Sequence, residues 1–245
     1  MKADFFELYE ALAAGVTSDE PITATASGDF WTLTETENST GIAMTTAGSS
    51  FPPMYPDGFE GLSLRAAAMA AMSWNFGEAA FGLASVNAWY NTAVNMERLQ
   101  SYEPFENYCT EGIDLDGMTV GMVGHLNGPA ELRAKAKEVY IIEKHPQPGD
   151  YPDSACDYIL PRCDLVLITG SSLVNKTLPH LLELCRDSYT IVTGPSVPMC
   201  PALLDFGIDR LAGMVVSDRP GMLEKARLSI PGSPYPLGAS FLLRK

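Results

Sequence analysis

Residues 164–175 read DLVLITGSSLVN, and this stretch decides how the second half of the chain folds. The run Asp164–Thr169 is almost wholly apolar, without the alternation of a half-exposed strand, and so predicts a strand buried on both faces. Gly170 ends the run, and small polar residues lead into a helical pattern over Asn175–Cys185. A buried strand followed closely by a helix predicts one unit of a parallel sheet covered by helices.

The same alternation occurs on both sides of this stretch. Short apolar runs predict further buried strands at Thr119–Val123, Val139–Ile142, Tyr189–Thr193 and Leu211–Val216. Helical patterns lie between them at Ala130–Glu138, Ser154–Leu160 and Pro201–Phe206. This order predicts an α/β domain over residues 106–245, a Rossmann-like doubly wound parallel sheet.

The first half, residues 1–105, has a different pattern. A helical segment, Asp4–Ala14, precedes three Thr-rich runs spaced about ten residues apart, which predict an antiparallel meander. A loop rich in Pro and Gly and two helical segments follow, so we expect an α+β domain joined to the second domain by the polar segment Arg98–Asp114. The three runs are Ile22–Ser27, Phe30–Thr36 and Gly41–Thr46, and the two later helices are Leu62–Met72 and Glu78–Tyr90.

The composition bounds the classes of function. The 245 residues carry 16 Lys and Arg against 30 Asp and Glu, a net charge of −14. Nucleic-acid phosphates and anionic lipids repel so acidic a chain, so we expect neither as a partner. The five cysteines form no C-x-x-C pair, which favours reduced thiols and a cytoplasmic location. We identify no signal peptide and no membrane span. The sequence leaves open whether the protein forms a homo-oligomer.

Ligands of an open parallel sheet bind beyond the carboxyl ends of its strands, so the residues there are the site candidates. The loop after the first strand, Gly121–Gly128, contains Gly124 and His125, and Glu143 follows the second strand. His125 is a candidate acid or base, and Glu143 is a candidate acceptor for ligand hydroxyls. The alternatives are that the glycine loop is only a tight turn and that Glu143 is only a solvated strand end.

Two later loops, Thr169–Asn175 and Gly194–Ser196, combine glycine with hydroxyl groups. We predict that they wall one anion-accepting pocket, whereas the alternative is that they only cap helices and turn the chain. Asn87 interrupts an apolar helix, and we expect its amide to reach the cleft between the domains, unless it bonds neighbouring backbone. The ligand-binding candidates are Asn87, Gly124, Thr169, Gly170, Ser171, Asn175, Gly194, Pro195 and Ser196, and the catalytic candidates are His125 and Glu143.

At these residues the chain resembles the DUF364 proteins, a family of heavy-metal chelation domain proteins. The resemblance covers most of the chain, and its most specific part is residues 164–178. It implies an N-terminal domain like that of enolase, a Rossmann-like second domain and a site in the cleft between them. The other matching segments are Ala84–Ala88, Gly194–Ser196, Gly207–Asp209, Gly213 and Val216–Asp218.

The resemblance further implies a small-molecule-binding protein, an enzyme that acts on a pterin-, flavin- or siderophore-like chelator. One alternative is a carrier of a metal chelate without chemistry. Another is a transferase that uses a nucleotide or methyl donor, which the absence of G-x-G-x-x-G weakens. His145 and His180 read as loop and surface residues. No cofactor is identified, and few histidines with no paired cysteines argue against a multi-ligand metal site.

Overall fold

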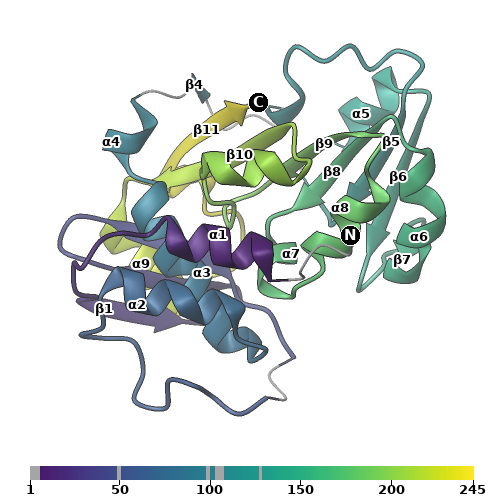
Figure 1. Cartoon of the computed structure of the whole chain (residues 1–245). Helices are drawn as coiled ribbons and strands as arrows, with labels where there is room; N and C mark the ends of the chain where they lie inside the picture. The colour runs from purple at the N-terminus through teal and green to yellow at the C-terminus, as the bar shows by residue number, and fades with distance from the viewer. Residues whose placement is uncertain (1–5, 49–50, 98–99, 103–107, 127–128) are drawn as a thin grey trace.

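The computed structural model describes residues 6–48, 51–97, 100–102, 108–126 and 129–245. These residues form a mixed α/β structure with two sheets, one small and antiparallel, the other large and mostly parallel (Figure 1). No helix among them is long and apolar enough to cross a membrane.

The large sheet has eight strands in the order β4-β11-β10-β9-β8-β5-β6-β7. The six strands from β10 to β7 in that order are parallel to one another, and β11 is antiparallel to both its neighbours. The chain winds outward from β5 in two directions, so the strand order reverses between β5 and β8. The strands are β4 (Gln100–Tyr102), β5 (Thr119–Val123), β6 (Glu138–Glu143), β7 (Tyr151–Pro152), β8 (Leu165–Thr169), β9 (Tyr189–Thr193), β10 (Arg210–Val216) and β11 (Gly238–Arg244).

All five strands predicted for the second half are present, but three of its predicted helical segments differ from expectation. The helix predicted over residues 175–185 is α8 (Leu178–Leu184), which begins later than expected, and a separate short helix, α7 (Ser171–Val174), lies in the segment predicted as a loop. Between them Lys176 has a φ of 65°, a left-handed conformation that no α-helix can contain. The helix predicted over residues 130–138 is α5 (Pro129–Lys135), which ends earlier because β6 begins at Glu138. The single helix predicted over Ser154–Leu160 is divided into three short elements, η3 (Asp153–Ala155), α6 (Cys156–Ile159) and η4 (Leu160–Arg162). The short helix η5 (Pro201–Phe206) has the predicted bounds.

The small sheet contains β1 (Ala24–Ser27), β2 (Trp31–Glu35) and β3 (Thr40–Met44), which form the predicted antiparallel meander. Helix α3 (Phe76–Tyr90) packs on one face and α9 (Arg219–Arg227), from the far end of the chain, packs on the other. Small side chains of β2 and β3 face α3, whereas larger ones join α9 in a hydrophobic cluster. The other helical elements of this half are α1 (Glu7–Ala14), α2 (Leu64–Ala68), η1 (Met69–Met72) and α4 (Ala93–Met96), and the later chain adds η2 (Tyr108–Thr110) and η6 (Tyr235–Leu237).

Gly41 shows how closely the small sheet and α3 approach. A Cβ atom at this position would lie 2.0 Å from the carbonyl oxygen of Ala84 and 2.2 Å from the backbone nitrogen of Ala88. Both atoms belong to the helix backbone, so neither can move aside as a flexible side chain could. Glycine in β3 therefore sets the distance between the sheet and α3.

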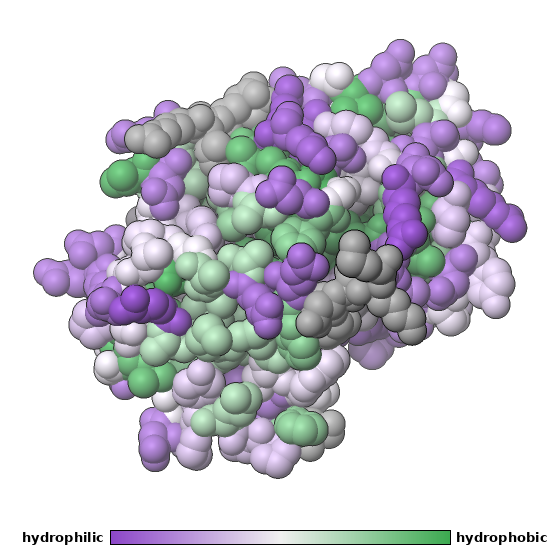
Figure 2. Space-filling view, in the orientation of Figure 1, coloured by the Kyte–Doolittle hydropathy of each residue, from purple (hydrophilic) through white to green (hydrophobic). Residues whose placement is uncertain are grey.

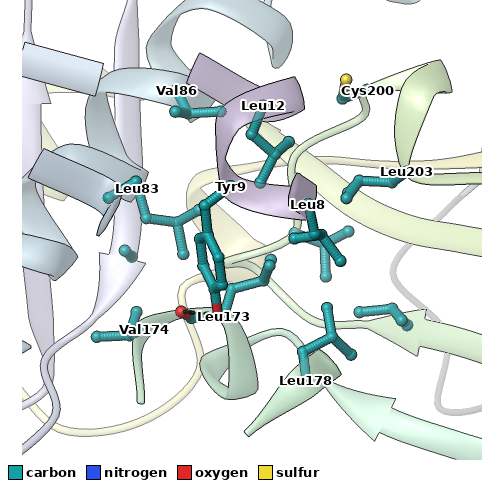
Figure 3. Packing of buried hydrophobic residues seen from close by; sticks show 14 of the residues in the cluster. Leu8, Tyr9, Leu12, Leu83, Val86, Leu173, Val174, Leu178, Cys200 and Leu203 are labelled. Carbon is teal, nitrogen blue, oxygen red and sulfur yellow. Dashed lines mark hydrogen bonds between the residues drawn. The ribbon is translucent and has the colours of Figure 1, made fainter. Parts of the chain in front are cut away.

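One hydrophobic cluster joins the two halves of the chain. Tyr9 of α1 is fully buried, and its hydroxyl donates to the carbonyl of Leu173 in α7, 2.9 Å away (Figure 3). Leu8 and Leu12 of the same helix belong to the cluster, together with Leu203 of η5. On the face shown in Figure 2, apolar side chains gather over the middle, where α1 and α2 lie, and hydrophilic side chains cover the rim. The boundary predicted near residue 105 does not separate the two sheets cleanly, because β4, which precedes it, belongs to the large sheet, and the two sheets share a core; whether they are two domains stays a prediction.

Candidate functional site

A cavity of about 560 Å³ lies beyond the carboxyl ends of β5, β6 and β8. Residues 123–125 line it at the end of β5, residues 142–145 line it at the end of β6, and Thr169 lines it at the end of β8. Residues 44–47, at the end of β3, contribute a wall from the small sheet. The cavity therefore lies at the point where the strand order of the large sheet reverses, which is where open α/β sheets bind ligands.

A smaller cavity of about 190 Å³ adjoins the first. It lies at the ends of β8 and β9, where Thr169, Thr193, Gly194 and Pro195 line it. Met44, His125 and Thr169 line both cavities, so the two spaces meet at these side chains.

The structure brings most of the predicted site residues to these two cavities. The larger cavity is lined by Gly124, His125, Glu143, Thr169, Ser171 and Asn175, and the smaller one by His125, Thr169, Gly194 and Pro195. Asn87, Gly170 and Ser196 line neither cavity. Asn127 and Gly128, the end of the glycine loop considered above, lie outside the described residues.

Gly124 allows the ends of β5 and β8 to approach each other. Its φ is 100°, and a Cβ there would lie 3.0 Å from the Cβ and Cγ2 of Thr169. Both the backbone conformation and the tight space favour glycine. The position directs the next residue, His125, toward the boundary between the two cavities.

Glu143 holds the backbone of this loop. Its Oε1 accepts the backbone N–H of His125 at 2.7 Å, and its Oε2 accepts that of Lys144 at 2.9 Å. The carboxylate therefore fixes the loop that carries His125, while its remaining lone pairs are available for a ligand.

Asp150 is a site residue that sequence reasoning missed. Its Oδ2 lies 2.6 Å from Nε2 of His125 and also accepts the backbone N–H of Gln147 at 2.8 Å. The hydrogen bond from His125 lowers the pKa of Asp150, with that from Gln147 as the next cause. A carboxylate at Nε2 stabilises the imidazole tautomer with its proton there, which leaves Nδ1 as an acceptor.

The hydroxyls of the Thr169–Asn175 loop bond mainly to one another. The Oγ atoms of Thr169 and Ser171 are 3.1 Å apart, and the Ser172 hydroxyl donates to the Thr169 carbonyl at 2.7 Å. Asn175 Oδ1 accepts the hydroxyl of Thr177 at 2.6 Å. Helix α7 has only four residues, so its dipole is weak, and the predicted anion-accepting role rests on these side chains rather than on a helix terminus.

Asn87 and Ser196 join the small sheet to the loop after β9. Nδ2 of Asn87 donates to the carbonyls of Ile42 at 2.7 Å and of Ser196 at 3.1 Å, while Oδ1 is buried without a partner. The Ser196 hydroxyl accepts the backbone N–H of Met44 at 2.8 Å. Asn87 thus reaches the second half of the chain. Its amide hydrogens bond to backbone carbonyls, in agreement with the alternative prediction that this side chain bonds neighbouring backbone rather than a ligand.

All three histidines of the chain line the larger cavity. His180, which the sequence places on the surface, lies 3.1 Å from Asp157, and His145 follows β6. Burial raises the pKa of the nearby Cys156 thiol to about 11, so this thiol is protonated at neutral pH. Among the described residues, no three His, Cys, Asp or Glu side chains are placed to hold a metal ion.

Comparisons with known proteins give the following matches. A DUF364 family model described as "Putative heavy-metal chelation" matches residues 113–233, and a DUF4213 model with the same description matches residues 9–90. The crystal structure of a DUF364-family protein of unknown function from Desulfitobacterium hafniense is 31% identical, covers 98% of each chain and has a TM-score of 0.87.

Two more distant relatives also match. A DUF364-family protein of unknown function from Pyrococcus horikoshii has the same fold, with 23% identity, a TM-score of 0.77 and coverage of 99% of this chain and 100% of its own. An uncharacterized protein of Methanocaldococcus jannaschii is 27% identical over 160 residues, which span 60% of this chain and 58% of that protein. The similarity to the D. hafniense structure extends over nearly the whole of both chains, and this chain belongs to the DUF364 family.

Proposed function

We propose that this protein binds a small organic molecule that can itself chelate a heavy metal, and that it binds this molecule in the larger cavity. The observation that carries the proposal is the cavity of about 560 Å³ at the reversal of the strand order. Its volume is within the range of about 300–1,000 Å³ typical of small-molecule sites. The description of the family models supports the link to heavy metals.

The proposal extends to chemistry on a pterin-, flavin- or siderophore-like chelator. His125 stands at the boundary of both cavities with Asp150 at its Nε2, an arrangement that suits an acid or base whose Nδ1 meets the ligand. Glu143 positions this histidine through its backbone. Ligand contacts from Gly124, Thr169, Ser171 and Asn175 belong to the same proposal.

Two features of the proposal concern the fold. We regard the large sheet as Rossmann-like, because its parallel strands wind outward in both directions from β5. That order also favours a second candidate function, a transferase that uses a nucleotide or methyl donor. The likeness of the first half to the N-terminal domain of enolase remains part of the proposal.

Native mass spectrometry of the purified protein tests the function directly. We expect a retained molecule of a few hundred daltons, with or without a metal ion, whereas a nucleotide or methyl donor would support the second candidate. Titration calorimetry with pterin, riboflavin and 2,3-dihydroxybenzoate, each with and without Fe³⁺, should show binding that His125→Ala weakens about tenfold. Arg65→Ala, at an exposed site outside both cavities, is the control. Absence of any retained molecule and of any binding would overturn the proposal.

A further inference from the structure

The carboxylate beside His125 is buried, whereas the imidazole itself is partly exposed. The side chain of Asp150 is only 5% exposed, and its Oδ2 lies 2.6 Å from Nε2 of His125. The side chain of His125 is 36% exposed and lines the larger cavity. Its backbone N–H donates to Glu143, so both the backbone and the ring of this histidine are held. The ring therefore has a fixed orientation before any ligand binds.

Nδ1 is the ring nitrogen of His125 that remains for a ligand. The hydrogen bonds that the described residues give His125 are those of Nε2 with Asp150 and of the backbone N–H with Glu143. In the neutral ring the proton lies on Nε2, so Nδ1 keeps its lone pair. Metal-binding histidines have this arrangement almost always, because the carboxylate orients the ring and makes its other nitrogen a stronger donor.

His180 offers a comparison within the same cavity. Its Nε2 also lies near a carboxylate, that of Asp157, at 3.1 Å. Both of these side chains are more than half exposed, at 55% and 56%. An exposed pair holds its geometry weakly, because two mobile side chains lose entropy when they come together. We therefore expect His125 to be the better metal donor of the two.

One imidazole can complete the coordination of a metal ion that a chelator already holds. Imidazole nitrogen suits copper, zinc, nickel and iron, and its lone pair replaces a water molecule on such an ion. The neutral ring of His125 releases no proton in this exchange, since Nδ1 carries none. We propose that Nδ1 of His125 coordinates the metal ion of a metal-loaded chelator in the larger cavity, with Asp150 as the positioning residue. This inference rests on the proposed function and adds a direct contact between the protein and the metal.

The copper(II) complex of diethylenetriamine is a suitable probe, because its chelator leaves one strong coordination position open. The chain contains three histidines, so His145→Ala/His180→Ala keeps His125 alone. In pulsed electron paramagnetic resonance, the remote nitrogen of a coordinated imidazole gives a characteristic modulation. We expect this modulation in the His125-only protein. It should change in Asp150→Asn, because the remote nitrogen is then Nε2, which Asp150 contacts.

Affinity distinguishes a built site from binding to any exposed imidazole. The matched protein, His125→Ala/His145→Ala, keeps His180 alone. The His125-only protein should bind the copper complex about tenfold more tightly, and Asp150→Asn should remove about tenfold of that affinity. Asp157→Asn in the His125-only protein is the control. It removes a carboxylate from the same cavity without contact to the His125 ring, so its effect should be at most about twofold.

Three results would overturn the inference: no imidazole modulation in the His125-only protein, equal affinity of the two single-histidine proteins, or equal losses in Asp150→Asn and Asp157→Asn. The wild-type protein provides the test should a double variant fail to fold. There the copper complex should broaden the ring signals of His125 at lower concentrations than those of His145 and His180, and the reverse order would also overturn the inference. A chelator retained in native mass spectrometry together with any of these results would leave the proposed function standing, with the chelator bound through its organic part.

Discussion

Asp150 controls one proton on the ring of His125. Because its carboxylate accepts at Nε2, the neutral form of the His125 ring should carry its proton on Nε2 and leave Nδ1 unprotonated. Asp150→Asn removes the charge that selects this tautomer, so we expect the ¹⁵N signals of the His125 ring to move toward those of a tautomer mixture.

The control for this variant is Asp157→Asn, which removes the carboxylate beside His180. It should change the ring signals of His180 and leave those of His125 in place. If the His125 ring signals are the same in wild type and Asp150→Asn, the tautomer assignment is wrong.

Lys176 predicts a dependence of stability on pH. Its ammonium group is buried, donates to the carbonyl of Ala71 and lies 4.7 Å from the ring centre of Tyr9. Burial lowers its pKa to about 7, so above pH 7 the unfolded chain binds more protons than the folded one. The free energy of unfolding should therefore rise by about 1 kcal/mol between pH 7 and pH 8 through this residue.

Lys176→Met isolates this contribution. The variant should lack the rise, as urea unfolding at the two pH values would show. Buried thiols such as Cys156 have raised pKa values, so their own contribution to stability falls as the unfolded chain loses its thiol protons toward pH 8. This contribution is common to both proteins, and the difference between their pH profiles isolates Lys176. Parallel pH profiles for the two proteins would contradict the prediction.

Site residues at strand ends could be predicted from the sequence, whereas those placed by packing between distant elements could not. Gly124 and His125 directly follow β5, Thr169 ends β8, and parallel topology alone brings strand ends together. Asp150 reaches His125 through the turn before β7, and His180 reaches the larger cavity from the start of α8. The placement of both depends on packing between distant elements. Trp31 reaches the smaller cavity because the small sheet packs against the large one, which no local pattern specifies.

At the scale of elements, the contact between β3 and α3 leaves no space at Gly41. Gly41→Ala would place a methyl group 2.0 Å from the Ala84 carbonyl, so the helix must shift from the sheet. Overpacking of this kind costs about 3 kcal/mol or more when the obstacle is backbone. We expect the free energy of unfolding, measured by urea titration, to fall by that amount.

Gly58→Ala is the matched control for this substitution. A Cβ at Gly58 meets no atom within 4 Å, although its φ of 83° adds some strain, so the loss should be about 1 kcal/mol. Similar losses for the two variants would show that backbone conformation, rather than the close approach, explains the effect at Gly41.

Several of the elements that sequence analysis missed have a weak local signal. The strands β4 and β7 contain three and two residues, too few to form a recognisable pattern. Helix α9 is polar over most of its length, and its three buried residues are Met222, Lys225 and Ala226. Its position depends on Arg219, which donates to Thr40 and to the carbonyl of Glu37 across the junction. Continuous apolar strands such as β8 and β9, in contrast, are defined by their own composition.

At the scale of the whole molecule, the shared core predicts one cooperative unfolding transition. Helix α1 packs on α7 through Tyr9 and Leu173, and Asn91 of the first half donates to the carbonyls of Val197 and Met214. If one half unfolded alone, the other half would lose these hydrogen bonds and packing contacts, so the two halves should unfold together. Calorimetry should show a single peak, and a fragment of residues 108–245 should lack a cooperative transition. Two separate peaks would contradict this and indicate independent domains.

The placement of α9 has a consequence for synthesis on the ribosome. The strands of the small sheet emerge early, but the helix that covers their second face is translated only after β10. Until then Trp31, Leu33 and Ile42 lack Met222 and Ala226, so the nascent chain presents an uncovered apolar face to chaperones. A premature stop codon just before Arg219 would therefore harm the part of the protein that was made first.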